Sequence, residues 1–149
     1  MTKAMIFAAG RGERMGALTQ ECPKPLLLVR GRPLISYHLK KLAAIGVKDC
    51  LINLHYLGEQ IRETLGDGSD LGINIHYSHE TEKLETAGGI VQALNFFDDQ
   101  PFILISGDIV TDYPFERLLS HSLNDHLAHL VMIDNPSHHQ AGEDRKSVV

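Results

Sequence analysis

A glycine-rich and positively charged segment near the N-terminus, residues 8–25, is the part of the chain best suited to chemistry. It begins Ala-Ala-Gly-Arg-Gly, so little side-chain bulk separates a ligand from the backbone. Arg11, Arg14 and Lys24 place positive charge beside these backbone N–H groups. Backbone donors combined with cationic side chains suit a polyphosphate. The segment is therefore predicted to hold a nucleoside triphosphate.

Lys24 is the most distinctive cation of this segment because it lies between two prolines. Pro23 and Pro25 restrict the backbone on both sides, so the lysine stands on a stiff support and loses little freedom when it meets a phosphate. The plainer interpretation is an exposed loop lysine between turn-forming prolines. The neighbouring glycine-rich stretch favours the phosphate contact.

Asp108 is the candidate metal ligand. It follows an apolar run, residues 101–106, and a glycine, which is the pattern of a carboxylate at the end of a buried strand. Mg²⁺ prefers one or two carboxylates together with phosphate oxygens. Gly-Asp is also common turn chemistry, and the sequence leaves both interpretations open.

Other polar segments have a functional and a plain interpretation. Residues 86–89, Thr-Ala-Gly-Gly, open a predicted helix and could seat a base or an anion, or form an ordinary cap with small residues for close packing. Glu80, Glu82 and Glu85 are predicted to form a solvated rim. The five histidines between residues 121 and 139 match no compact zinc spacing and are predicted to be surface or satisfied side chains.

Several familiar catalytic motifs do not fit the sequence. Gly10-x-Gly12-x-x-x-Gly16 has its third glycine one position too late for a dinucleotide fingerprint, and a proline-containing loop replaces the expected helix. The chain has no G-x-x-x-x-G-K-[ST] motif and no Ser/His/Asp or Cys/His set at a known spacing. These patterns argue against a dehydrogenase, a P-loop NTPase and an enzyme with a covalent nucleophile.

Strands and helices are predicted to alternate along the chain. Apolar or alternating runs predict strands at 3–8, 26–29, 49–54, 73–77, 101–106 and 127–133, and helical spacing predicts helices at 33–45, 57–65, 86–96 and 114–120. This order predicts an α/β fold with a mainly parallel sheet. Ligands bind such sheets at the carboxyl ends of the strands, where the segment after residue 8, the stretch before Thr86 and Asp108 all fall.

The overall composition is that of one globular domain. The chain has 149 residues, of which 43% are hydrophobic and 22% charged, enough for a substantial core. Its net charge of −5 argues against nucleic-acid binding, and no apolar run is long enough to span a membrane. The N-terminus does not resemble a secretory signal, and Cys22 and Cys50 form no C-x-x-C pair, so a cytoplasmic protein with free thiols is predicted.

Together these motifs resemble the signature of the sugar-1-phosphate nucleotidyltransferases. The matching runs are Ala8-Ala9-Gly10-x-Gly12-x-Arg14-Met15, Leu18-Thr19, Pro23-Lys24-Pro25-Leu26 and Gly31-x-Pro33-Leu34-Ile35. The resemblance implies a Rossmann-like three-layer sandwich with a mainly parallel central sheet, and transfer of a nucleotide to a sugar-1-phosphate with release of pyrophosphate. Residues 84–89 and 66–69 look closest to members that use UTP and N-acetylmuramate-1-phosphate in peptidoglycan recycling. Mannose-1-phosphate guanylyltransferases are the alternative.

The resemblance also implies a role for each site residue and a need for Mg²⁺. Arg14 would neutralise the triphosphate, Lys24 would contact phosphate at the reacting centre, and Asp108 would bind Mg²⁺. The other residues would hold the nucleotide or line its site: Ala8, Ala9, Gly10, Gly12, Glu13, Glu85, Thr86, Gly88 and Ser106. Such chemistry depends on positioning and charge neutralisation rather than on a protein nucleophile.

The resemblance further implies that the nucleotide-binding domain is incomplete. The family's second metal-binding aspartate and most of its sugar-binding segments lie later in the fold. Residues 1–136 are therefore predicted to form a domain truncated at its C-terminus, and residues 137–149 a polar tail. A nucleotide-binding module without catalysis is the alternative to an enzyme, and an exposed edge strand could pair two copies into a homodimer.

Overall fold

The computed structural model describes residues 1–10, 13–80 and 86–134. The chain divides into two compact units, Met1–Leu119 and Ser120–Val149. Every helix and strand of the described residues lies in the first unit. Within the described ranges, no helix is long and apolar enough to cross a membrane.

The first unit is built on a four-stranded sheet in the order β5-β4-β1-β6. β1 pairs in parallel with both β4 and β6, and β4 pairs in parallel with β5. The predicted parallel α/β architecture is thereby confirmed. The strands span Lys3–Phe7 (β1), Asp49–Leu54 (β4), Asn74–His79 (β5) and Phe102–Ser106 (β6).

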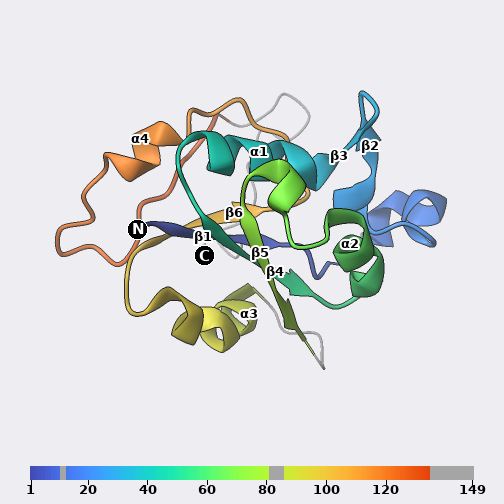
Figure 1. Ribbon diagram of the computed structural model, residues 1–149, viewed down its shortest axis with the longest axis horizontal. Helices are drawn as coiled ribbons and strands as arrows, with labels where there is room; N and C mark the ends of the chain where they lie inside the picture. The colour runs from blue at the N-terminus through green and yellow to red at the C-terminus, as the bar shows by residue number, and fades with distance from the viewer. Residues whose placement is uncertain (11–12, 81–85, 135–149) are drawn as a thin grey trace. The chain divides into compact units, whose positions relative to one another are not determined.

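Helices cover both faces of this sheet, and Figure 1 shows α1 (Leu34–Ala44) and α3 (Thr86–Ala93) on opposite sides of it. Side chains alternate along β1, so Ile6 joins the larger core under α1 and α2 (Gly58–Leu65), while Met5 joins a smaller core under α3. The 3-10 helix η4 (Leu94–Phe97) extends α3 and contributes Phe97 to the smaller core. Two apolar faces on one sheet explain why the strands read as short, nearly continuous hydrophobic runs.

Most predicted elements are present near their predicted bounds. The predictions at 26–29, 114–120 and 127–133 differ from the structure. The run at 26–29 is divided between the 3-10 helix η2 (Lys24–Leu26) and a two-stranded hairpin of β2 (Leu28–Val29) and β3 (Arg32–Pro33). The predicted helix at 114–120 contains only α4 (Glu116–Leu119). The remaining short elements are the 3-10 helices η1 (Glu13–Thr19) and η3 (Ser69–Leu71).

The predicted strand at 127–133 is wrong. These residues have no strand structure and belong to the second unit. The apolar side chains of this run are solvent-exposed: the exposed fractions of Leu127, Met132 and Ile133 are 101%, 75% and 82%. A strand needs a partner for its backbone groups, and no described residue pairs with this run.

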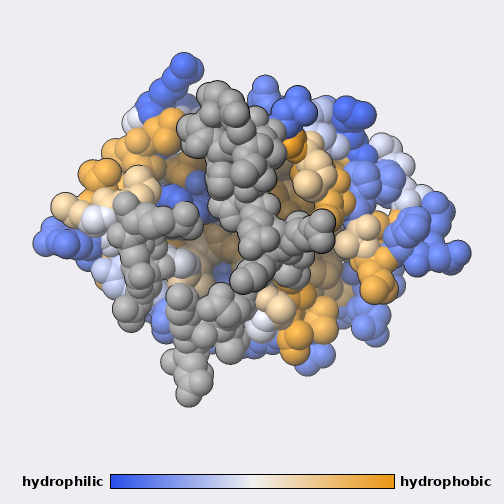
Figure 2. Space-filling model, turned by 180° about the vertical axis from the view of Figure 1, so that it is seen from behind, coloured by the Kyte–Doolittle hydropathy of each residue, from blue (hydrophilic) through white to orange (hydrophobic). Residues whose placement is uncertain are grey.

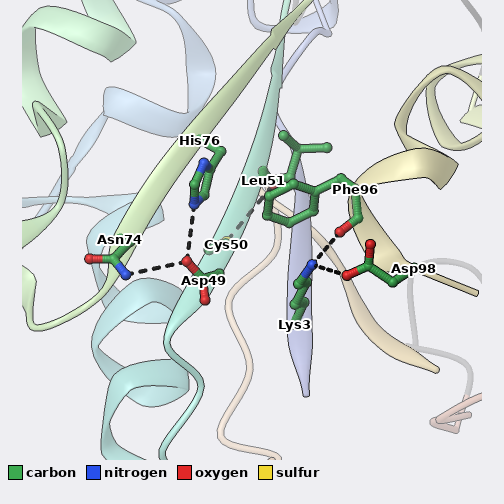
Figure 3. A network of polar contacts seen from close by, with 8 residues as sticks. All are labelled: Lys3, Asp49, Cys50, Leu51, Asn74, His76, Phe96 and Asp98. Atoms are coloured by element: carbon green, nitrogen blue, oxygen red, sulfur yellow. Dashed lines mark hydrogen bonds and ion pairs between the residues drawn. The ribbon is translucent and has the colours of Figure 1, made fainter. Parts of the chain in front are cut away.

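Polar contacts join the amino ends of the strands, at the edge of the sheet away from Asp108 (Figure 3). Lys3 Nζ donates to the Phe96 carbonyl at 2.5 Å and to Asp98 Oδ2 at 2.7 Å. On the neighbouring strands, Asp49 Oδ1 accepts from His76 Nε2 at 3.0 Å, and this hydrogen bond is the main reason that the pKa of Asp49 is lowered. These contacts tie β1 to η4 and β4 to β5, so we interpret the network as structural.

Apolar side chains also reach the surface. β6 is an edge strand, and its Leu104 is 37% exposed. Figure 2 shows orange hydrophobic areas among hydrophilic ones on the rear face. An open edge is what the homodimer prediction requires, and the homodimer stays a prediction.

Both cysteines are free thiols, and burial raises the pKa of Cys50 to about 12.

Candidate functional site

The sheet topology brings the loops after β1 and β6 together. From β1 the chain crosses to β4 and β5 on one side and returns to β6 on the other side. The loops that follow β1 and β6 therefore leave neighbouring strands at the point where the strand order reverses, which is where open α/β sheets bind ligands. Lys24 lies in the first of these loops and Asp108 in the second.

Lys24 stands on a compact support rather than on an extended loop. It begins η2, with Pro23 and Pro25 buried on either side. The Leu26 N–H donates to the Pro23 carbonyl at 2.8 Å, and the Leu27 N–H donates to the Lys24 carbonyl at 3.1 Å. Lys24 therefore belongs to a hydrogen-bonded turn between two buried prolines, and the stiffness of this mounting stays a prediction.

Lys24 and Asp108 form an ion pair although 84 positions separate them in the chain. Lys24 Nζ donates to Asp108 Oδ2 at 2.7 Å, and Ser106 Oγ donates to Asp108 Oδ1 at 2.9 Å. The Lys24 and Asp108 side chains are 28% and 42% exposed, so a ligand can reach them from solvent. Burial alone would raise the pKa of Asp108, but the hydrogen bonds from Lys24 and Ser106 and the Lys24 charge outweigh it and lower that pKa. Asp108 is therefore an anion at neutral pH.

Gly107 lets the turn before Asp108 rest directly on the end of β1. Its N–H donates to the Phe7 carbonyl at 2.9 Å, and a Cβ at this position would lie 2.5 Å from the same oxygen. We expect Gly107→Ala to lower the free energy of unfolding by about 1–3 kcal/mol, as overpacking does. Urea unfolding followed by circular dichroism measures this. Gly10→Ala is the control, because its Cβ would meet nothing within 4 Å; an equal loss in both variants would contradict the explanation.

Two side chains of α1 hold the segment that follows Asp108. His38 Nε2 donates to the Ile109 carbonyl at 2.8 Å, so this nitrogen carries the hydrogen. Lys41 Nζ donates to the carbonyls of Thr111 and Tyr113 at 2.8 and 3.0 Å. The helical spacing that predicted a helix at 33–45 gave no indication of this role for His38. These contacts fix the backbone that leads away from Asp108.

His38 predicts a pH dependence of stability. Burial is the main cause that lowers its pKa from 6.5, so the folded chain disfavours the proton that the unfolded chain accepts. Its contribution is therefore complete above pH 6.5 and decreases as the pH falls towards the folded pKa. We expect the melting temperature to fall from about pH 7 to about pH 5, and to fall less in His38→Gln, whose amide can still donate to Ile109. Equal slopes in scanning calorimetry would contradict this.

Glu80 is not part of a solvated rim, so that prediction is wrong for this residue. Glu80 is only 6% exposed, and its Oε1 accepts a hydrogen bond from Asn53 Nδ2 at 2.7 Å. Asn53 Oδ1 in turn accepts from the Ala8 N–H at 2.8 Å. The Ala8 amide is thus engaged within the protein. Sequence reasoning missed Asn53, because a polar residue at the end of an apolar strand looks like an ordinary strand end.

The other predicted site residues that the structure describes lie after β1 or at the starts of η1 and α3. Ala9 and Gly10 follow β1, Thr86 is the first residue of α3, and Gly88 lies in the first turn of that helix. Glu13 and Arg14 begin η1. Several predicted residues lie outside the described part of the chain: Gly12, Glu82, Glu85, His138 and His139.

Asp108 fits one kind of metal site. Among the described residues, no group of three or more His, Cys, Asp or Glu side chains could hold a metal ion by itself. Mg²⁺ is commonly held by one or two carboxylates together with substrate phosphates and water. A solvent-accessible carboxylate beside a lysine that can bind phosphate has the donor chemistry for such shared coordination.

Comparison with known proteins gives closely related sequences. The chain is 50% identical over 145 residues to the N-acetylmuramate alpha-1-phosphate uridylyltransferase of Neisseria meningitidis serogroup B, covering 95% of this chain and 63% of the relative. It is 38% identical over 141 residues to the mannose-1-phosphate guanyltransferase of Yarrowia lipolytica, covering 91% of this chain and 39% of the relative. The chain thus spans less than two thirds of the length of these relatives.

Solved structures share the fold. A Bacillus anthracis protein assigned as a glucose-1-phosphate thymidylyltransferase matches with a TM-score of 0.76 at 22% identity, covering 80% of this chain and 49% of that chain. HddC from Yersinia pseudotuberculosis matches with a TM-score of 0.72 at 25% identity, covering 80% and 53%. A family model described as nucleotidyl transferase matches residues 3–142. This match shows that the chain belongs to the nucleotidyl transferase family.

Proposed function

We propose that this chain is the nucleotide-binding part of an enzyme that joins a nucleoside triphosphate to a sugar-1-phosphate and releases pyrophosphate. The observation that carries the proposal is the Lys24–Asp108 pair at the carboxyl edge of the sheet. This pair places an ammonium group that could bind phosphate 2.7 Å from a carboxylate that could bind a metal ion. Family membership supports the reaction class.

The reaction needs charge control more than a protein nucleophile. An oxygen of the sugar phosphate attacks the α-phosphorus of the triphosphate in line, a new P–O bond forms, and the P–O bond to pyrophosphate breaks. Negative charge develops on the phosphate oxygens, and positioned cations stabilise it. Lys24 would supply such a cation from its rigid mounting on η2. We assign Arg14, at the start of η1, to the triphosphate on the sequence pattern alone.

Asp108 would hold Mg²⁺ together with phosphate oxygens of the bound nucleotide. When bound, the metal would neutralise phosphate charge and help to orient the triphosphate. Asp108 accepts hydrogen bonds from Lys24 and Ser106. Lys24 must therefore release the carboxylate as it turns to the phosphate.

The substrates that we favour are UTP and N-acetylmuramate-1-phosphate. The relative with 50% identity is named for this pair, whereas the guanyltransferase relative is less similar at 38%. Pyrophosphate release from UTP with N-acetylmuramate-1-phosphate, compared with release from GTP with mannose-1-phosphate, distinguishes the two substrate pairs. Faster release from the second pair would replace the first assignment.

Calorimetry added to this assay separates an enzyme from a binding module. If UTP binds in calorimetry but no pyrophosphate forms at high protein concentration, the chain is a nucleotide-binding module. If neither UTP nor GTP binds, the proposed site itself is wrong.

A further inference from the structure

Two buried polar side chains, Asn53 and Glu80, lie between the segments proposed to hold the nucleotide. Asn53 is on β4, opposite Phe7 of β1 in the parallel register, and Glu80 directly follows β5. They are 4% and 6% exposed. They are therefore buried polar groups to which the proposed reaction assigns no part.

Asn53 joins the end of β1 to the end of β5. Its Oδ1 accepts from the Ala8 N–H at 2.8 Å, and its Nδ2 donates to Glu80 Oε1 at 2.7 Å. Glu80 is also held through its backbone, since its N–H donates to the Leu54 carbonyl at 2.8 Å and its carbonyl accepts from His55 Nδ1 at 3.1 Å. The Glu80 backbone is therefore fixed against the end of β4, and its carboxylate meets Asn53 there.

The third segment in contact with this pair is the beginning of α3. A Cβ added at Gly89 would lie 2.9 Å from Glu80 Oε1 and 3.2 Å from Asn53 Nδ2. The backbone of α3 thus approaches the pair closely, and a side chain at position 89 would force the pair or the helix to shift. The same two side chains contact the first residue after β1 and the first turn of α3.

We propose that Asn53 and Glu80 are positioning residues that fix the spacing between the Ala8 backbone and the start of α3. This inference rests on the proposed function and on the sequence-based predictions that the loop after β1 holds the triphosphate and that residues 86–89, at the start of α3, seat the base. The pair then sets the distance between the two halves of one nucleotide site. A bound nucleotide benefits from both halves only when their spacing matches its length.

The chemistry of the pair explains these residue types. An amide side chain can accept from a backbone N–H with its oxygen and donate to a carboxylate with its nitrogen, as Asn53 does. In a buried place each group needs its partner, because an unsatisfied polar group is costly. Loss of the Glu80 acceptor should therefore release Asn53, and with it both the Ala8 backbone and α3.

The test compares two ligands in the whole chain by isothermal titration calorimetry. UTP with Mg²⁺ needs both halves of the site, whereas tripolyphosphate with Mg²⁺ needs only the first. We expect Glu80→Met to weaken UTP binding roughly tenfold or more and tripolyphosphate binding less than about threefold, since misplacing one half affects only the ligand that spans both. Glu80→Gln keeps an oxygen that can accept from Asn53 and should stay within about threefold of wild type for both ligands. Glu63→Met, at an exposed position of α2, is the matched control and should change neither affinity.

A second variant keeps the test decisive if Glu80→Met does not fold. Gly89→Ala keeps both hydrogen-bonding side chains but adds a methyl group that would lie 2.9 Å from Glu80 Oε1, so the pair or α3 must shift and UTP binding should again weaken selectively. The proposal is overturned if UTP and tripolyphosphate weaken by the same factor, if UTP binding is unchanged, or if Glu80→Gln behaves like Glu80→Met. Failure of the wild-type chain to bind either ligand would instead overturn the proposed function, and this inference with it.

Discussion

Replacing Lys24 with methionine is expected to reduce pyrophosphate formation from UTP and N-acetylmuramate-1-phosphate by roughly 10²- to 10³-fold, the usual cost of removing one transition-state donor. Methionine keeps much of the apolar stem and removes only the ammonium group. UTP binding should weaken by about 10- to 100-fold, because a hydrogen bond from a charged group is lost. Calorimetry and a coupled pyrophosphate assay measure the two effects.

The fold should survive this substitution. The Lys24 and Asp108 side chains are 28% and 42% exposed, and such an ion pair contributes only about 0.2–1 kcal/mol to stability. Lys48→Met removes the same charge from an exposed loop and is the control. Unchanged UTP affinity in Lys24→Met would make Lys24 a structural partner of Asp108 and nothing more. Unfolding of the variant would show that the lysine is needed for the fold.

Asp108→Asn is expected to abolish the dependence of UTP binding on Mg²⁺. The amide has nearly the same shape and can still accept from Lys24, but it lacks the charge that attracts a hard cation. Without Mg²⁺, the variant should bind UTP more tightly than the wild type, because Lys24 is no longer neutralised by a carboxylate at 2.7 Å. The measurement is the UTP affinity of both proteins with Mg²⁺ and with a chelator.

Asp112→Asn is the matched control for that experiment. Asp112 is exposed, lies four positions further along the same segment, and carries the same charge. If both variants gain affinity for UTP without Mg²⁺ by the same factor, the gain reflects overall charge rather than release of Lys24. A wild-type Mg²⁺ dependence that persists in Asp108→Asn would exclude Asp108 as the metal ligand.

Much of the first unit could be predicted because its signals are local. Apolar runs and helical spacing identified β4 with the bounds Asp49–Leu54 and placed α1 and α3 within a few residues of their positions. The alternation of these elements leads to a parallel sheet, and the parallel sheet places all the loops after its strands at one edge. The predictions were wrong where burial depends on a distant partner, as for the run at 127–133, which is apolar but exposed.

The amino-acid sequence by itself indicated which residues could contact phosphate and predicted a stiff support for them. Glycine and proline act on their own backbone and their immediate neighbours, so their effects can be read locally. Two features depended on tertiary structure: the ion pair between Lys24 and Asp108, and the burial of Glu80 against Asn53. Each joins positions that lie on different strands or loops, separated by 84 and 27 residues. A periodic pattern reports which face of an element is apolar. It does not report which side chain of another element will meet a given polar group, because that depends on the order and register of the strands.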